Sequence, residues 1–150
     1  MTNEAYRAKE WLNRNYNFAS QVDADRRMLM IMESRLTSAV AKYESDGTES
    51  RDTDQARSRH EDALLDYSMQ KKKVEAEERK LLSEMTKTRR AIDELSLPEH
   101  QAVAIDRYIN RLSWNDIAKE EHVSRSQLFR VHADMLEKMA EILRGGRYDT

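Results

Sequence analysis

Apolar residues recur every seven positions through the first third of the chain, with polar residues between them. One row consists of Val22, Leu29, Leu36 and Tyr43, and a second, interrupted by Asp25, of Phe18, Met32 and Ala39. This period places apolar side chains along one face of an α-helix, as in helices that pair lengthwise. We therefore expect a helix that begins at Thr2 or Asn3 and ends near Tyr43. Three residues outside this register, Trp11, Leu12 and Tyr16, leave open a break near residues 13–17.

A second helix is expected from about Thr53 to Glu94, because this segment contains neither glycine nor proline. Its first heptad row consists of Tyr67, Val74, Leu81, Thr88 and Leu95, and its other row of Leu64, Lys71, Glu78, Met85 and Ile92. The charged members favour a loose antiparallel helical hairpin, coiled-coil-like but not a strict coiled coil. Residues 44–54, ESDGTESRDTD, form its loop. Two helices alone bury little apolar surface, so we expect two copies to pair through their hairpins.

The pattern changes at the single proline, Pro98, after which three shorter helices are expected. Ser96 to Glu99 has the sequence of a capping box that starts the first of them. The residues of this helix that face a core, at helical spacing, are Ile105, Tyr108, Ile109 and Leu112.

The other two short helices have the arrangement of a helix-turn-helix. Ser113 caps a helix from Trp114 to about Glu121, His122 and Val123 make the turn, and Ser124 caps a helix from Arg125 to about Arg144. Gly145 and Gly146 end that last helix, and we expect residues 145–150 to be a flexible tail. The predicted fold is therefore all-α, with a helical hairpin over residues 1–95 and a helix-turn-helix over residues 96–144.

The last helix turns its apolar side chains inward, which leaves an outer set at its start. The outer residues, predicted to contact DNA bases, are Arg125, Ser126, Gln127, Phe129 and Arg130. Arginine can bond guanine bidentately, glutamine can bond adenine, and a phenylalanine edge can meet a thymine methyl group. The predicted phosphate contacts are Ser113, Ser124, Lys119, Arg111 and His132, with Arg107 as a further candidate. For Phe129 and His132, packing within the protein is an alternative to DNA contact.

The segment RYINRLSWNDIAKEEHVSRSQLFRVHADMLEKM resembles region 4 of sigma-70 factors and, more closely, the small phage regulators of the ArpU-like group. The residues that fall on the group's signature are Arg107, Tyr108, Ile109, Leu112, Ser113, Trp114, Asp116, Ile117, Ala118, Ser124, Arg130, His132 and Leu136. The resemblance extends loosely from about Ala63 to the end. It implies a phage or prophage transcription activator that contacts RNA polymerase, with the residues that follow Ser124 facing the −35 element of a promoter. One departure is His122, where such units commonly carry glycine; histidine tolerates a positive φ better than most residues.

The charge balance limits how strongly this helix-turn-helix can bind DNA by itself. The whole chain has a net charge of −2, and from Pro98 to the end eight Lys and Arg stand against nine Asp and Glu. Affinity from phosphate contacts alone should therefore be weak. A second copy related by two-fold symmetry would add a second half-site, so we expect a dimer.

The sequence contains few features that would indicate another class of function. The chain has no cysteine, and its four histidines, at positions 60, 100, 122 and 132, share no metal-ligand spacing with carboxylates. Neither a catalytic motif nor a Gly-rich phosphate loop is present, so we expect no enzyme, no cofactor and no metal. The longest apolar run, Met28 to Met32, has five residues, against roughly 20 for a membrane span. With no secretory leader in the sequence, we expect a protein of the bacterial cytoplasm that does not enter the membrane.

The leading hypothesis is a sequence-specific DNA-binding transcriptional regulator that reads a major groove with the helix starting at Arg125. One alternative is a protein-interaction module that docks on RNA polymerase or a host factor, which the acidic balance and the run Met28, Met30 and Met32 favour. Another is a phage DNA-packaging recognition subunit, since that class also joins a helix-turn-helix to a helical oligomerisation region.

Overall fold

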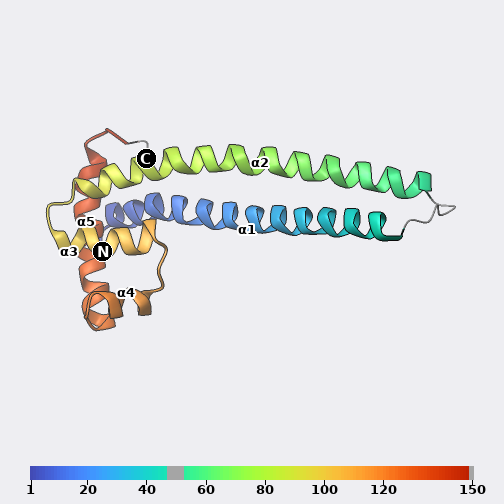
Figure 1. The fold of residues 1–150 in the computed structure, drawn as a ribbon. Coiled ribbons are helices and arrows are strands. Elements are labelled where there is room, and N and C mark those ends of the chain that lie inside the picture. The colour runs from blue at the N-terminus through green and yellow to red at the C-terminus, as the bar shows by residue number, and fades with distance from the viewer. Residues whose placement is uncertain (47–52, 149–150) are drawn as a thin grey trace. The chain divides into compact units, whose positions relative to one another are not determined.

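The computed structural model describes residues 1–46 and 53–148, and all the regular structure within these ranges is helical (Figure 1). In chain order the elements are α1 (Asn3–Asp46), α2 (Thr53–Asp93), α3 (Pro98–Ala104), the π-helix η1 (Ile105–Ile109), α4 (Trp114–Glu120) and α5 (Arg125–Arg144). The all-α prediction is confirmed. The chain forms two compact units: unit 1 combines Met1–Ala19 with the chain from Leu81 onward, and unit 2 is Ser20–Lys80. The predicted boundary at residue 95 thus differs from the division by packing.

The first long helix is continuous, with no break near residues 13–17. Asn15 explains why, because it lies on the same heptad row as Val22 and Leu29 and its side chain is buried. Its amide donates hydrogen bonds to the hydroxyl oxygen of Thr88 and, at 3.3 Å, to the backbone carbonyl of Glu84. The helix also extends three residues beyond Tyr43, so residues 44–46 are helical rather than part of the predicted loop. Of that loop, residues 47–52 lie outside the described residues.

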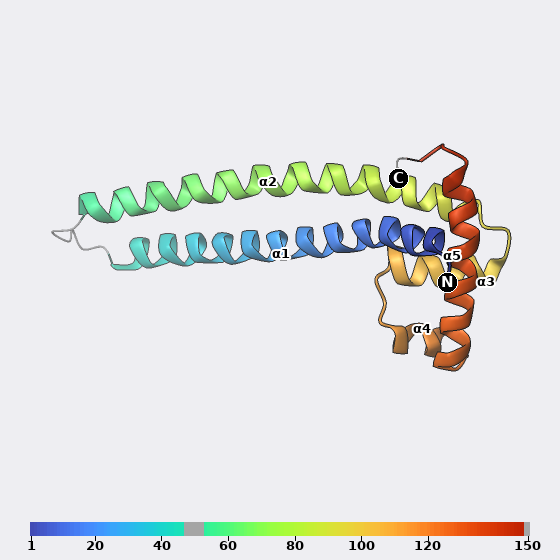
Figure 2. The ribbon, with the colours of Figure 1, turned by 180° about the vertical axis from the view of Figure 1, so that it is seen from behind.

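In unit 2, α1 and α2 lie side by side and antiparallel (Figures 1 and 2). The first predicted row of each helix is confirmed where its side chains are described, since Val22 and Val74 are buried and Leu29, Leu36 and Tyr67 are half-buried. The side chain of Tyr43 lies outside the described part of the structure. The second row predicted for α2 is wrong in this unit. Its members Leu64, Lys71 and Glu78 are exposed.

Polar residues occupy the second row of α2 in their place, where Gln70 and Glu77 are half-buried. The Gln70 amide donates to the backbone carbonyl of Asp25 at 3.0 Å. The Lys73 ammonium lies 3.7 Å from the Asp25 carboxylate and 4.0 Å from that of Glu77. Lys73 is thus the charged partner of both carboxylates. Polar side chains therefore take part in the contact between α1 and α2 in unit 2.

The main core of unit 1 is assembled from both ends of the chain. Its buried residues come from α1, α2, the helices α3 and η1, and α5, and they are Ala5, Ala8, Trp11, Leu12, Ala91, Ile92, Leu95, Ala104, Tyr108, Met135, Leu136, Met139, Ala140 and Leu143. Leu12, Ile92, Met135, Leu136 and Met139 are among its fully buried side chains. The helix-turn-helix therefore shares its core with the first turns of α1 and the last turns of α2.

The first short helix begins differently from the predicted capping box. Leu97, with an extended backbone, is the N-cap, Pro98 is the first helical residue, and no side chain caps the helix. Ser96 stands one residue too early to serve as the cap. The Leu97 carbonyl accepts hydrogen bonds from the amides of His100 and Gln101, both at 3.1 Å. Proline fits this position because its missing N–H would have no intrahelical partner there.

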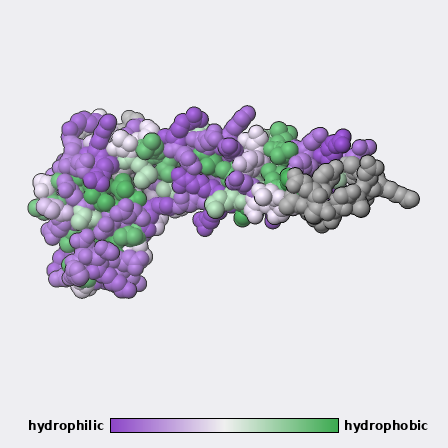
Figure 3. Space-filling view, viewed as in Figure 1, coloured by the Kyte–Doolittle hydropathy of each residue, from purple (hydrophilic) through white to green (hydrophobic). Residues whose placement is uncertain are grey.

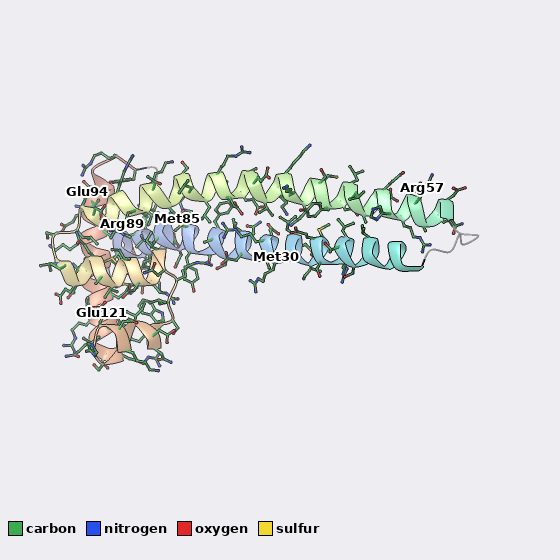
Figure 4. All side chains as sticks on the ribbon, in the orientation of Figure 1. Met30, Arg57, Met85, Arg89, Glu94 and Glu121 are labelled. Carbon is green, nitrogen blue, oxygen red and sulfur yellow. The ribbon has the colours of Figure 1, made fainter. Side chains whose placement is uncertain are left out.

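The described end of the chain, residues 145–148 of the predicted flexible tail, makes contacts with α1 and the end of α2. The Tyr148 hydroxyl donates to the Glu94 carboxylate at 2.6 Å, and its ring meets Trp11 edge-on with centroids 5.8 Å apart. Arg147 forms an ion pair with the same Glu94. Figure 4 labels Glu94 at the end of α2. Residues 149–150 lie outside the described part of the chain.

Candidate nucleic-acid interface

The start of α5 presents all five residues predicted to contact bases. Arg125, Ser126, Gln127, Phe129 and Arg130 are exposed, whereas Leu128 between them is fully buried. Leu128 packs in a small second core with Val103 of α3 and Ile117 of α4. This core seats the N-terminal turns of α5 on the preceding helices, so the outer side chains extend from a fixed backbone.

The serine caps predicted for α4 and α5 both form. The Ser113 hydroxyl accepts from the Asp116 amide at 3.1 Å. At α5 the capping box is complete, because Ser124 accepts from the Gln127 amide at 3.2 Å while the Gln127 side-chain oxygen accepts from the Ser124 amide at 3.2 Å. Bidentate bonding to adenine needs both atoms of a side-chain amide. Gln127 would therefore have to leave the cap to read an adenine in that way, so in this arrangement it serves the helix.

The turn between α4 and α5 contains a left-handed residue at the predicted position. His122 has a φ of 54°, and the Val123 amide closes the turn on the Ala118 carbonyl at 3.0 Å. This is where helices commonly place glycine after their last turn. Arg111 has a φ of 56°, a second such position that the sequence did not indicate. It follows the end of η1, where the Leu112 amide donates to the Asp106 carbonyl at 2.9 Å.

Arg107 is half-buried and packs against aromatic rings of the fold, apart from the exposed set at the start of α5. Its guanidinium lies 4.5 Å from the centroid of the Trp114 ring and 4.9 Å from that of Tyr16. It also donates to the Leu112 carbonyl at 2.9 Å. Arg107 thereby links α1 and η1 to the segment that leads into α4. The role of Tyr16 had no signal in the sequence, because the contact joins residues that are 91 positions apart in sequence.

His132 is a packing residue, and the prediction that it contacts phosphate is wrong. Its side chain is buried, its Nε2 lies 2.7 Å from the Tyr108 hydroxyl, and Trp114 meets it edge-on at 4.7 Å. Burial, together with the charges of Lys9 and Arg107, lowers the pKa of His132 to about 4. Burial raises the pKa of the Tyr108 hydroxyl to about 12. At neutral pH a neutral imidazole therefore shares this hydrogen bond with a protonated tyrosine.

The remaining predicted phosphate contacts differ in exposure. Ser113, Ser124 and Lys119 are exposed, whereas Arg111 is half-buried. Two acidic residues, Glu121 and Asp106, lie close together beside the turn. Burial and a hydrogen bond with Asp106 raise the pKa of the Glu121 carboxyl. Figure 4 labels Glu121 at the end of α4. The positive charge of the candidate surface is thus concentrated at the start of α5 and on Lys119.

Other kinds of site find less support in the part of the chain that the structure describes. Within residues 1–46 and 53–148, no three histidine or carboxylate side chains come together in a way that could hold a metal ion. A cleft of about 930 Å³ lies beside the C-terminal end of α5, lined by α1 and α5 residues that include Arg7, Trp11 and Leu143. It contains none of the predicted base or phosphate contacts. Every helix in the described ranges is too short or too polar to cross a lipid bilayer.

Comparison with known proteins identifies no relative: no protein-family model, no curated protein and no solved structure matches this chain.

Proposed function

We propose that this protein is a sequence-specific DNA-binding transcriptional regulator that reads a major groove with the start of α5. The observation that carries the proposal is the exposed set around Arg125 and Arg130. These residues lie at the start of a capped helix whose opposite face packs into the core through residues such as Leu128 and Met135. Arg125 and Arg130 would bond guanine, and Ser113, Ser124 and Lys119 would contact phosphates. The resemblance to ArpU-like regulators and to sigma-70 region 4 supports a phage or prophage activator that works with RNA polymerase in the bacterial cytoplasm.

The proposal includes a pair of copies joined through unit 2. Large apolar side chains stay exposed on this hairpin, where Met30 is 68% exposed and Met69 62%. Figure 4 shows Met30 pointing away from α2, and Figure 3 shows hydrophobic side chains at the surface of the hairpin. A second hairpin that covers these side chains would remove their apolar surface from water, which would stabilise the pair. Pairing would also supply the second half-site that a nearly neutral binding surface requires.

Selection from a library of DNA duplexes with a randomised core tests this function directly. We expect wild-type protein to enrich one sequence family that contains guanines. The Arg125→Ala/Arg130→Ala variant should lose about 1–3 kcal/mol of discrimination for each base contact removed. It should also show a shallower dependence of binding on salt concentration.

A matched control removes two positive charges from exposed positions of α2 through Arg57→Ala/Arg59→Ala. This control should enrich the same sequence family as the wild type. If the wild type enriches no family, or if both double variants behave alike, the groove-reading proposal is wrong.

A second candidate function is a protein-interaction module that docks on RNA polymerase, favoured by the exposed methionines of the hairpin. Methionine adapts its shape to varied partners, which suits a docking surface. Binding of the purified polymerase in the absence of DNA, weakened by Met30→Ser/Met69→Ser, together with no enrichment in the DNA selection, would favour this function.

A further inference from the structure

A continuous stack of aromatic rings and guanidinium groups reaches the exposed start of α5. The Arg125 guanidinium lies 5.6 Å from the centroid of the Phe129 ring, one helical turn later. Phe129 meets Trp114 of α4 edge-on, with centroids 5.3 Å apart and planes at 63°. Trp114 is in turn covered by Arg107 at 4.5 Å. The stack therefore extends from the interior of unit 1 to an outward-facing arginine.

Each contact in this stack restrains the next one. Trp114 touches Arg107 on its ring face and His132 edge-on, so its indole is fixed from two sides. Phe129 is 42% exposed, and its contact with this fixed indole gives the ring one preferred position. An arginine on a helix surface otherwise samples many rotamers, and a cation over an aromatic face favours some of them by about 0.5–1 kcal/mol, equivalent to roughly twofold to fivefold in population.

We infer that Phe129 is a positioning residue that holds the Arg125 guanidinium ready for guanine, and that it does not itself contact a thymine methyl group. This inference rests on the proposed function. Preorganising a side chain reduces the ordering cost of its contact with DNA, so it strengthens the bond to the correct base. Phe129 thereby determines specificity through Arg125.

A double-mutant cycle separates positioning from direct contact. The probes are the duplex enriched in the selection and the same duplex with the guanine opposite Arg125 replaced by adenine. Phe129→Leu should lower the wild-type discrimination between them by about twofold to fivefold. In an Arg125→Ala background the same change should have no further effect, because nothing remains to position. Phe129→Tyr, which keeps the ring, should retain the wild-type discrimination.

If Phe129→Leu lowers discrimination equally with and without Arg125, or lowers it at a thymine instead, Phe129 contacts the base and the inference is wrong. Melting temperatures of all variants, compared with that of Ser126→Ala, identify any loss of folding. Ser126 is exposed on the same turn and takes no part in the stack.

A measurement without DNA distinguishes failure of the inference from failure of the proposed function. In the NMR spectrum of the free protein, the ring current of Phe129 should move the Arg125 side-chain protons upfield. The shift should remain in Phe129→Tyr and vanish in Phe129→Leu. If the shift is present but no duplex is enriched, the stack holds Arg125 and the proposed function fails. If the shift is absent in the wild type, Phe129 does not position Arg125 and the inference is overturned.

Discussion

The imidazole of His132 is buried, and this burial makes the free energy of unfolding of unit 1 depend on pH. The ring is 6% exposed, and its Nε2 is hydrogen-bonded to the Tyr108 hydroxyl. The nearest charges that act on it, those of Lys9 and Arg107, are both positive and oppose its protonation. The histidine therefore serves the fold as a neutral polar residue.

We expect the free energy of unfolding to fall as the pH is lowered from 6.5 toward 4. The pKa of His132 is about 4 in the folded protein, whereas a histidine exposed to water has a pKa of 6.5, so the unfolded chain binds the proton first. The stabilisation is complete above pH 6.5 and is lost through this window, by about 3 kcal/mol at most. Urea unfolding at several pH values measures it. His132→Gln, which does not titrate, should flatten the pH dependence in this window, and an unchanged slope would contradict the assignment.

The observed helices agree with those predicted from the sequence where apolar residues and helix breakers determine the structure. They differ from the prediction where polar residues are packed between helices. Pro98 and the serine caps set the helix starts, so α5 begins and ends at the predicted residues. The second row of α2 could not be predicted, because the pattern of Leu64 and Met85 suggested one face while Gln70 and Glu77 occupy another. Their burial depends on partners in α1 that a single helix pattern does not reveal.

The same distinction separates the predicted site from the observed one. Arg125 and Arg130 were predictable because heptad-like spacing identifies the inner face of α5 and leaves the rest outside. His132 is buried against Tyr108 and Trp114, which come from other helices, and Arg107 contacts Tyr16, which is 91 positions away in sequence. No local pattern distinguishes such a residue from an exposed one.

The polar pair of Asn15 and Thr88 should fix the register of α1 on α2. Thr88→Val leaves the buried Asn15 amide without its hydroxyl partner, which should cost about 1–3 kcal/mol. Replacing both, as Asn15→Leu/Thr88→Val, should recover most of that stability because no polar group is left unpaired. Chemical denaturation of the two variants measures the difference. A double variant that is less stable than the single one by the full additive amount would contradict this view.

At the scale of the whole molecule, the helix-turn-helix belongs to the same compact unit as the first turns of α1, whereas residues 20–80 form a unit of their own. Thr2 donates to the Glu137 carboxylate through its amide at 3.1 Å and its hydroxyl at 3.0 Å. Arg144 pairs with Glu4. Together with the shared core around Leu12 and Leu136, these contacts make the first helical turns part of the same compact unit as the helix-turn-helix.

Replacing Ser20–Lys80 with a short Gly/Ser turn should therefore give a folded protein that no longer pairs. We expect cooperative unfolding, helical circular dichroism and the mass of one copy in solution, whereas the full chain should have the mass of two. A matched fragment, residues 97–150, should be unfolded because it lacks Leu12, Ile92 and their neighbours in the core. If the shortened chain has the mass of two copies, pairing does not depend on the hairpin.

The contacts between the start of α1 and α5 also determine when the core of unit 1 can be completed during synthesis. Ala5, Ala8 and Leu12 are covered by residues near Met135 to Leu143, about 130 positions later in the sequence. At roughly 5–20 residues per second, the ribosome makes the first segment on the order of ten seconds before its partner. Until α5 is made, the core that α1 shares with α2 and η1 lacks the apolar side chains of α5. A chaperone that recognises exposed apolar helices would therefore be able to bind this segment until α5 emerges.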